Sequence, residues 1–223
     1  EILRCLVGSE MCIRDRSTLN TRQYATKGYL EKLIAQVFTG RERFEPGNPQ
    51  EGYSPSPQER QSWLQISYMK EAYHTMGPKF TLGWMAEALY SSKNFSENYT
   101  ATMMQAGEFA PTPHSKLMYN EAFRANQYVA AGIKPIYVLN DMFQFRTEFY
   151  GFTPIFPIKK NALNKAYYGK AFSRFEYMGE VSVICHLPFG AISAYVNHYS
   201  SPRREWNVGM TIGWQLFNYR FVE

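Results

Sequence analysis

The sequence has 223 residues, of which 45% are hydrophobic and 17% aromatic, and its mean hydropathy is -0.41. It contains no run of about 18 apolar residues, so it is not a helical membrane protein. The net charge of +5 comes from Lys and Arg residues scattered among Glu and Asp, which argues against a nucleic-acid partner. A β-barrel, a carbohydrate-binding sandwich and an aromatic-rich core would all account for the aromatic excess.

The first sixteen residues differ from the rest of the chain. Residues 1–16, EILRCLVGSEMCIRDR, show no clear period and lack the apolar core and cleavage site of a signal peptide. They resemble a translated sequencing-adapter read-through that recurs at the ends of metagenomic and transcriptomic gene sequences. We therefore expect residues 1–16 to be non-native and residues 17–223 to be the C-terminal part of a longer protein. Of the three cysteines only Cys185 then remains, which leaves no disulfide framework and no cysteine-based metal site.

Beyond that segment, apolar and polar residues alternate with a period of two, which predicts β-strands. The alternation predicts about eight strands, at residues 28–43, 62–75, 80–90, 123–139, 143–150, 174–187, 192–197 and 206–217. Several are far longer than the five or six residues of an ordinary strand, and about 9–11 residues suffice to cross a bilayer when tilted. Pro135 suggests a bulge or a strand edge.

Short turns and longer loops connect these strands alternately, as in an antiparallel meander. The tight turns are predicted at Gly77–Pro78, Asn140–Asp141 and Pro188–Gly190. The longer connections are 46–57, 91–121 and 154–168, and we expect the second to be irregular. Long loops on one side and short turns on the other are typical of outer-membrane barrels.

The last strand shows the pattern most clearly. One face carries Trp206, Val208, Met210, Ile212, Trp214 and Leu216, and the other carries Asn207, Gly209, Thr211, Gly213 and Gln215. Such a strand has one apolar face and one small or polar face, which favours lipid on the outside and a hydrated lumen inside.

The polar faces of the predicted strands also carry many charges. They are Glu87, Arg124, Lys134, Arg146, Glu148, Arg174, Glu176 and Glu180. A dry core would have to compensate for the desolvation of every one of them, whereas a hydrated lumen does not impose that cost. The fold class predicted is therefore all-β, an antiparallel meander of about eight long strands in a transmembrane β-barrel. The alternative is a sandwich with one solvated face on each sheet.

Four short stretches carry a family resemblance, and it extends from about Tyr24 to the end of the chain. They are Tyr99–Thr102, Pro111–Ser115, Phe123–Tyr128 and His186–Ser193. Residues 109–137 resemble the C-terminal region of patatin-like phospholipases of Bacteroidetes-type bacteria, which join a patatin hydrolase domain to an outer-membrane barrel. The turn after His186 is similar to the proline–apolar–glycine–proline turn of the bacterial surface antigen superfamily, with Ala191 in place of the second proline.

The resemblance implies an outer-membrane module that anchors or exports a patatin-like lipid acyl hydrolase domain located upstream. The implied partners are outer-membrane lipid, the barrel assembly machinery and that upstream domain. The family barrel has about sixteen strands, so the resemblance implies that the eight strands predicted here are the C-terminal half of a transmembrane β-barrel. Such barrels usually end in an aromatic residue, and the final Glu223 departs from that pattern.

We predict no catalytic, cofactor-binding or metal-binding residue in this fragment. It lacks the Gly-x-Ser-x-Gly elbow of a patatin site, so it is not expected to be an enzyme itself. The histidines His74, His114, His186 and His198 lie in separate segments and do not predict a metal site. Glu148 and Glu176 are interpreted as paired lumen charges rather than as an acid/base pair.

Two other functions are considered. The first is a surface-antigen-type barrel that inserts or translocates proteins. The second is a soluble, aromatic-rich binding sandwich, which predicts two packed sheets.

Overall fold

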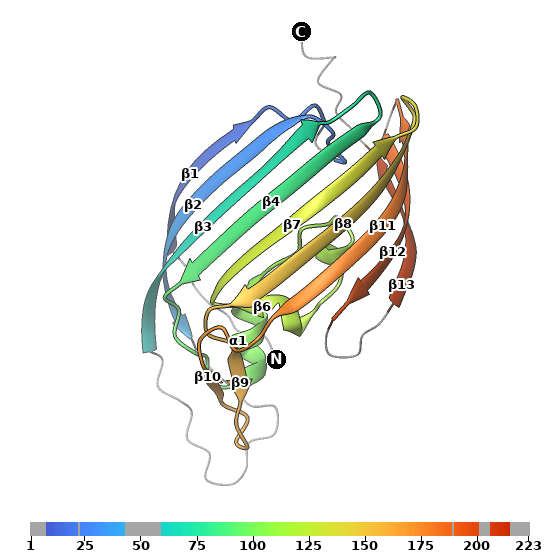
Figure 1. Cartoon of the computed structure of the whole chain (residues 1–223). Coiled ribbons are helices and arrows are strands. Elements are labelled where there is room, and N and C mark those ends of the chain that lie inside the picture. Colours follow the sequence, from blue (N-terminus) through green and yellow to red (C-terminus); the bar gives the residue numbers. More distant parts are fainter. Residues whose placement is uncertain (1–7, 22, 43–58, 189, 201–205, 215–223) are drawn as a thin grey trace.

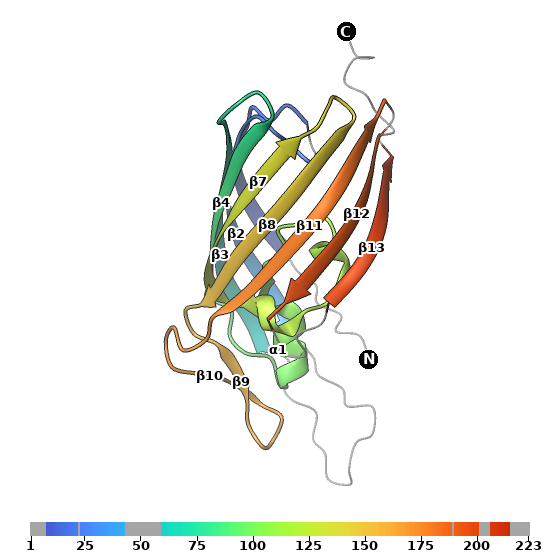
Figure 2. The same ribbon diagram turned by 45° about the vertical axis from the view of Figure 1, so that its right-hand side comes forward.

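The computed structural model describes residues 8–21, 23–42, 59–188, 190–200 and 206–214. Most of them form one nine-stranded antiparallel sheet in the order β1-β2-β3-β4-β7-β8-β11-β12-β13. Its strands are β1 (Gly8–Ser17), β2 (Gly28–Glu42), β3 (Glu59–Thr75), β4 (Phe80–Ser91), β7 (Gln127–Val138), β8 (Phe143–Pro154), β11 (Glu176–Leu187), β12 (Gly190–Tyr199) and β13 (Trp206–Trp214). The sheet curves into a trough with a concave and a convex face (Figures 1 and 2).

The prediction of an all-β antiparallel meander is confirmed. The eight predicted strands correspond to β2, β3, β4, β7, β8, β11, β12 and β13. In the sheet order β1 and β13 lie at opposite ends, so the described residues do not form a closed barrel. Nor do they form the two large packed sheets that the sandwich alternative requires, because the two other sheets have two strands each. Residues 215–217 of the predicted last strand, the loop 46–57 and the chain end at Glu223 lie outside the described residues.

The ninth strand, β1, lies almost entirely within residues 1–16, which the sequence predicts to be non-native. It pairs with β2 over its whole length, from Gly8 opposite Thr39 to Ser17 opposite Leu30. It is an edge strand, and every one of its side chains from residue 11 to residue 17 is exposed. β1 therefore extends the sheet through backbone hydrogen bonds without contributing to the buried core.

The two faces of the sheet differ as the alternation predicts. Val208 on the convex face is 79% exposed and Phe149 53% exposed, whereas Arg146 and Glu148 on the concave face are buried. The exposed convex side chains include Leu33, Val37, Leu64, Ile66, Tyr68, Phe80, Tyr90, Val129, Ile133, Tyr137, Phe143, Phe145, Phe149, Tyr177, Val181, Val183, Val196, Trp206, Val208, Met210 and Ile212. The larger apolar side chains thus point away from the molecule on strand after strand.

Two details of the predicted strand 123–139 are wrong. Pro135 interrupts the β7–β8 ladder, but the register is unchanged from Ile133 opposite Phe149 to Ile136 opposite Arg146, so no residue is inserted and no bulge forms. The proline ring removes one backbone N–H donor, and the alternation of faces along β7 is unchanged. The alternation over residues 123–139 places Ala125 on the same face as the outward Val129 and Ile133, but Ala125 is fully buried because the chain before Gln127 belongs to a separate short strand, β6 (Arg124–Ala125).

The connection between β4 and β7 is not irregular throughout. It contains α1 (Tyr99–Gln105), β5 (Gly107–Glu108), the 3₁₀ turns Ser115–Leu117 and Glu121–Phe123, and β6. The Asn98 side chain caps α1 by accepting a hydrogen bond from the Ala101 amide, a standard way to start a helix. Among the described residues no helix is long and apolar enough to span a membrane.

This connection, residues 92–126, is called the inner segment because it packs against the concave face of the sheet (Figures 1 and 2). Phe109 and Phe123 are buried against Tyr128, Tyr150 and Phe152 of β7 and β8. Phe109 stacks on Phe152 with ring centroids 5.8 Å apart. Fully burying a phenyl ring contributes about 1.5–3 kcal/mol, so these rings fix the inner segment to the sheet.

The connection between β8 and β11 forms a small hairpin of its own, outside the large sheet. Its strands are β9 (Ile158–Lys160) and β10 (Ala166–Tyr168). It extends beyond the lower end of the sheet, next to α1 (Figure 1).

Candidate functional site

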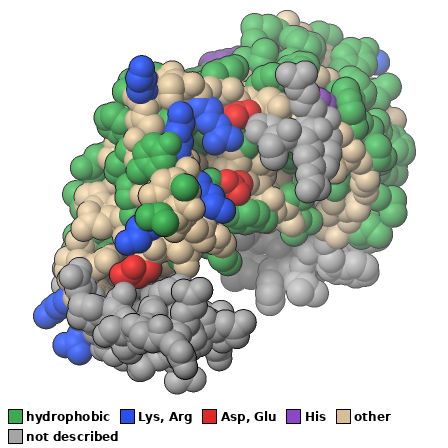
Figure 3. Space-filling view, turned by 90° about the horizontal axis from the view of Figure 1, so that it is seen from below, with side chains coloured by type: hydrophobic (Ala, Val, Ile, Leu, Met, Phe, Trp, Pro, Cys, Tyr) green, Lys and Arg blue, Asp and Glu red, His purple; other side chains and the backbone are tan. Residues whose placement is uncertain are grey.

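The candidate site is the polar interior between the inner segment and the concave face of the sheet. It contains a cavity of about 920 Å³ bordered by β2, β3, β4, β7 and β8 together with Leu19, residues 23–25 and the inner segment. Seen from below, basic and acidic side chains gather around a hollow, while hydrophobic side chains cover much of the outer surface (Figure 3). The charged side chains around the cavity therefore lie on the concave side of the sheet.

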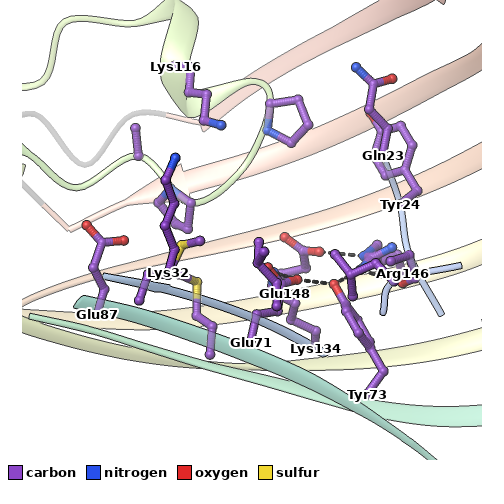
Figure 4. A pocket seen from close by; sticks show the side chains of 18 of the residues that line it. Gln23, Tyr24, Lys32, Glu71, Tyr73, Glu87, Lys116, Lys134, Arg146 and Glu148 are labelled. Atoms are coloured by element: carbon purple, nitrogen blue, oxygen red, sulfur yellow. Dashed lines mark hydrogen bonds and ion pairs between the residues drawn. The ribbon is translucent and has the colours of Figure 1, made fainter. Parts of the chain in front are cut away.

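Two buried ion pairs form the floor of this cavity (Figure 4). Lys134 Nζ lies 2.6 Å from Glu71 Oε1, and Arg146 Nε lies 2.5 Å from Glu148 Oε1. Tyr73 also belongs to this network, because Arg146 Nη2 donates to its hydroxyl at 2.9 Å. All these residues come from neighbouring strands with the same inward register, so the alternation alone brings them together.

Part of the remaining hydrogen-bonding capacity of the arginine pair is used by its surroundings, although Arg146 Nη1 is buried without a hydrogen-bond partner among the described residues. Tyr150 Oη donates to Glu148 Oε2 at 2.6 Å, and Arg146 Nη2 also donates to the Ala25 carbonyl at 3.2 Å. A buried ion pair is tolerated when further hydrogen bonds satisfy its partners in this way. The pair therefore also ties residues 23–25 to the sheet.

A second polar cluster lies against β11 and β12 and is built around His114 of the inner segment. Its Nδ1 lies 2.8 Å from Glu180 Oε1, and its Nε2 lies 3.3 Å from Ser193 Oγ. Tyr24 Oη donates to the same Ser193 Oγ at 2.8 Å. His114 and Ser193 are each 1% exposed and Glu180 is 3% exposed, so the cluster is closed to solvent.

Local hydrogen bonds hold the His114 backbone in place. The Thr112 amide donates to Ser115 Oγ at 3.0 Å, and the Ser115 amide donates to Thr112 Oγ1 at 3.1 Å. These reciprocal bonds close a turn around Pro113 and His114. The imidazole is then stacked on Tyr195 of β12, with the two rings 15° from parallel. Its orientation is fixed from both sides, by the turn and by the stack.

The sheet places two carboxylates side by side at this point. Glu148 on β8 and Glu180 on β11 are direct partners in the ladder. Each has a separate basic neighbour, Arg146 for Glu148 and His114 for Glu180. The two polar clusters are therefore adjacent parts of one network. Tyr24 connects them, because it lines the cavity and also bonds to Ser193.

Burial raises the pKa of the Tyr24 phenol above its ordinary value, and the nearby Glu180 carboxylate raises it further. The hydrogen bond with Ser193 and the charge of Arg146 act in the opposite direction. Tyr24 therefore stays a neutral hydroxyl that can donate a hydrogen bond. Its backbone has a φ of 55°, in the left-handed region that few residues other than glycine adopt.

The structure separates the four histidines that the sequence singled out. His114 is buried in the cluster just described, while His198 stacks on Tyr177 on the convex face. His74 is exposed, and His186 is only partly buried at the end of β11. In the described parts of the chain, no three His, Cys, Asp or Glu side chains are grouped so as to hold a metal ion.

Glu148 and Glu176 are not a pair with each other. Glu148 pairs with Arg146 and Glu176 with Arg174, whose Nε lies 2.7 Å from Glu176 Oε1. Their interpretation as paired charges is confirmed. The sequence did not indicate the cluster of His114, Glu180 and Ser193, because these residues are 66 and 79 positions apart and no local pattern connects them.

Compared with family models, with curated proteins and with solved structures, the chain gives no match.

Proposed function

We propose that this chain is part of a transmembrane β-barrel in a bacterial outer membrane, where it anchors or exports a patatin-like acyl hydrolase domain located upstream. The membrane role rests on one observation: from β4 to β13 the convex face of the sheet is largely apolar, exposed and free of Asp, Glu, Lys and Arg, while the concave face is polar and charged. On β2 and β3 the convex face also carries the paired positions Glu31 and Lys70. A contiguous apolar surface of this extent is unusual on a soluble monomer and indicates contact with lipid or another protein.

The dimensions of the strands agree with this role. β4, β7, β8 and β11 each have 12 residues, and about 9–11 residues in a tilted strand cross a bilayer. Their convex residues contain no charge, from Phe80 to Tyr90 on β4 and from Phe143 to Thr153 on β8. Lipid would face that surface, and the lumen would lie on the side of the sheet that carries the buried ion pairs.

The role of anchor or exporter for a hydrolase is supported by the resemblance of residues 109–137 to patatin-like phospholipases. The upstream reading frame of the same gene tests it. A Gly-x-Ser-x-Gly elbow upstream would support the hydrolase parent, because that turn exposes the nucleophilic serine. Periplasmic helper domains in its place would indicate the surface-antigen-type barrel that inserts or translocates proteins.

Depth-dependent fluorescence quenching tests the membrane role. The full chain is refolded into phosphatidylcholine vesicles whose acyl chains carry bromine. Each variant keeps one of the four tryptophans and has the other three replaced by Phe. Trp206 lies on the convex face and is 71% exposed, whereas Trp63 stacks on Phe38 with ring centroids 5.0 Å apart. The register with Phe38 places Trp63 on the concave face, so it is the matched control.

We expect brominated acyl chains to quench Trp206 strongly and Trp63 weakly. Equal quenching of both, or a folded chain that stays monomeric in buffer without lipid or detergent, would contradict the membrane role.

A further inference from the structure

The buried cluster at His114 has the arrangement of a nucleophilic catalytic centre. An activated serine needs a base within hydrogen-bond reach and a third group that orients the base. Here His114 Nε2 lies 3.3 Å from Ser193 Oγ, and His114 Nδ1 lies 2.8 Å from Glu180 Oε1. Serine–base distances slightly above 3.2 Å are common without a bound substrate.

We propose that Ser193, His114 and Glu180 form a serine esterase site on the concave face, acting on carboxylic esters with an apolar acyl chain. This goes beyond the anchoring role and departs from the sequence-based expectation that the fragment has no catalytic residue. The constellation is recognised by geometry, since it recurs on unrelated folds and in different chain orders.

The reaction follows from the three contacts. His114 Nε2 takes the proton of the Ser193 hydroxyl as Ser193 Oγ forms a bond to the ester carbonyl carbon. The tetrahedral intermediate collapses, the bond to the alcohol oxygen breaks, and the alcohol leaves with the proton from His114. Water then attacks the acyl-serine with His114 as base again, releasing the carboxylic acid and restoring Ser193.

Glu180 is a positioning residue in this scheme. Its carboxylate accepts from His114 Nδ1, which turns Nε2 toward Ser193 and stabilises the imidazolium formed during attack. The Tyr195 ring stacks on the imidazole and limits its rotation.

Tyr24 supplies the hydrogen-bond donor for the developing oxyanion. Its hydroxyl lies 2.8 Å from Ser193 Oγ, and its raised pKa keeps the phenol protonated. When a substrate carbonyl approaches Ser193, the same donor is within reach of the carbonyl oxygen. Its left-handed backbone conformation is of the kind that clusters at functional sites.

The cavity provides the room for the acyl chain. Tyr24 and Pro113, the neighbour of His114, both line it, so it reaches the edge of the cluster. Its apolar lining includes Ile34, Met69, Met85 and Leu117. Because Ser193 is 1% exposed, a bound substrate must open a path from the cavity to Ser193 while the Tyr24 hydroxyl stays within hydrogen-bonding reach of the ester carbonyl. An apolar chain in the cavity would stabilise that opened state.

Labelling with an alkyl fluorophosphonate tests the nucleophile directly. The refolded full chain is treated with the probe and digested, and mass spectrometry locates the phosphonylated residue. Turnover of 4-nitrophenyl butyrate and decanoate is measured on the same material, with Ser193→Ala, His114→Ala and Glu180→Gln. Ser182→Ala is the matched control, since Ser182 is also buried on the concave face but makes no hydrogen bond within the described residues.

We expect the wild-type chain and Ser182→Ala to be labelled equally, at Ser193. His114→Ala should lower kcat/KM by about 100- to 10,000-fold, the range of a lost general base. Glu180→Gln should lower kcat by at least about tenfold after normalisation to the fraction of chain that the probe labels at saturation, because a loss of folding alone would lower kcat only in proportion to that fraction. Folded wild-type chain that is not labelled at Ser193, or Ser193→Ala with wild-type turnover, would overturn the proposal. Neither result bears on bilayer insertion, which is measured separately.

Discussion

Tyr150 of β8 lies across Gly132, its direct partner on β7. A Cβ at position 132 would meet the Tyr150 ring and approach the Phe149 carbonyl oxygen to 2.7 Å. The same relationship joins Tyr73 to Gly83 and Tyr195 to Gly209. Each glycine lets a tyrosine lie flat on the concave face. The Tyr73 and Tyr150 hydroxyls then reach the buried ion pairs, and the Tyr195 ring reaches His114.

The first prediction follows from this packing. Gly132→Ala should lower the free energy of unfolding by about 1–3 kcal/mol, the usual cost of overpacking. The added methyl group would push the Tyr150 ring away from the β7 backbone on which it packs. Urea unfolding of the refolded chain, followed by tryptophan fluorescence, measures the change. Gly77→Ala is the control, since no atom lies within 4 Å of a Cβ there. Similar costs at positions 132 and 77 would show that the ring packing is unimportant.

Sequence periodicity predicted the sheet because its information is local. Each strand carries its own alternation, so the inward position of Lys134, Arg146 and Glu180 followed from counting residues. Residues 1–16 show no clear period, so the alternation does not predict β1, and the absence of a bulge at Pro135 depends on both partner strands. Alternation assigns a face to a residue, but it does not fix how a proline is accommodated.

The candidate site could be predicted only in part. Alternation put Glu180 and Ser193 on polar faces, but it gave no reason to bring His114 to them. His114 belongs to the inner segment, whose position is determined by burial of Phe109 and Phe123 against β7 and β8. That contact depends on the shape of the finished trough, which no local pattern encodes.

The second prediction concerns the buried ion pair of Arg146 and Glu148. Arg146→Met leaves the Glu148 carboxylate without its cation and should cost about 3–5 kcal/mol of unfolding free energy. The double variant Arg146→Met/Glu148→Leu should recover most of that loss, because no unpaired charge remains. Equilibrium urea unfolding of the single and double variants checks both.

Arg174 gives the matched comparison, since it also pairs with the glutamate two positions later. Its side chain is 32% exposed, against 3% for Arg146. Arg174→Met should therefore cost less than about 1 kcal/mol, as partly exposed pairs do. If the two substitutions lowered the free energy of unfolding equally, water would reach both ion pairs to the same extent.

The third prediction distinguishes a lipid-facing surface from a solvent-facing one. Val181 is near the middle of β11 on the convex face and is 41% exposed. In a membrane, Val181→Arg should lower the free energy of unfolding from vesicles by about 2–4 kcal/mol. On a soluble surface the change should stay within about 0.5 kcal/mol. Phe175→Arg, just outside β11, is the control and should cost less, because the penalty falls toward the interface.

The last prediction concerns residues 1–16. Every side chain of β1 from residue 11 to residue 17 is exposed, so, among the side chains that the structure describes, deletion of residues 1–16 removes little buried apolar area. The free energy of unfolding should fall by less than about 1 kcal/mol, and the quenching of Trp206 by brominated lipid should be unchanged. Truncation after Ser200 removes the opposite edge strand, β13, together with Gly209 under Tyr195, and should destabilise the chain more. If deletion of residues 1–16 were the more damaging of the two, β1 would be an integral strand of the native fold.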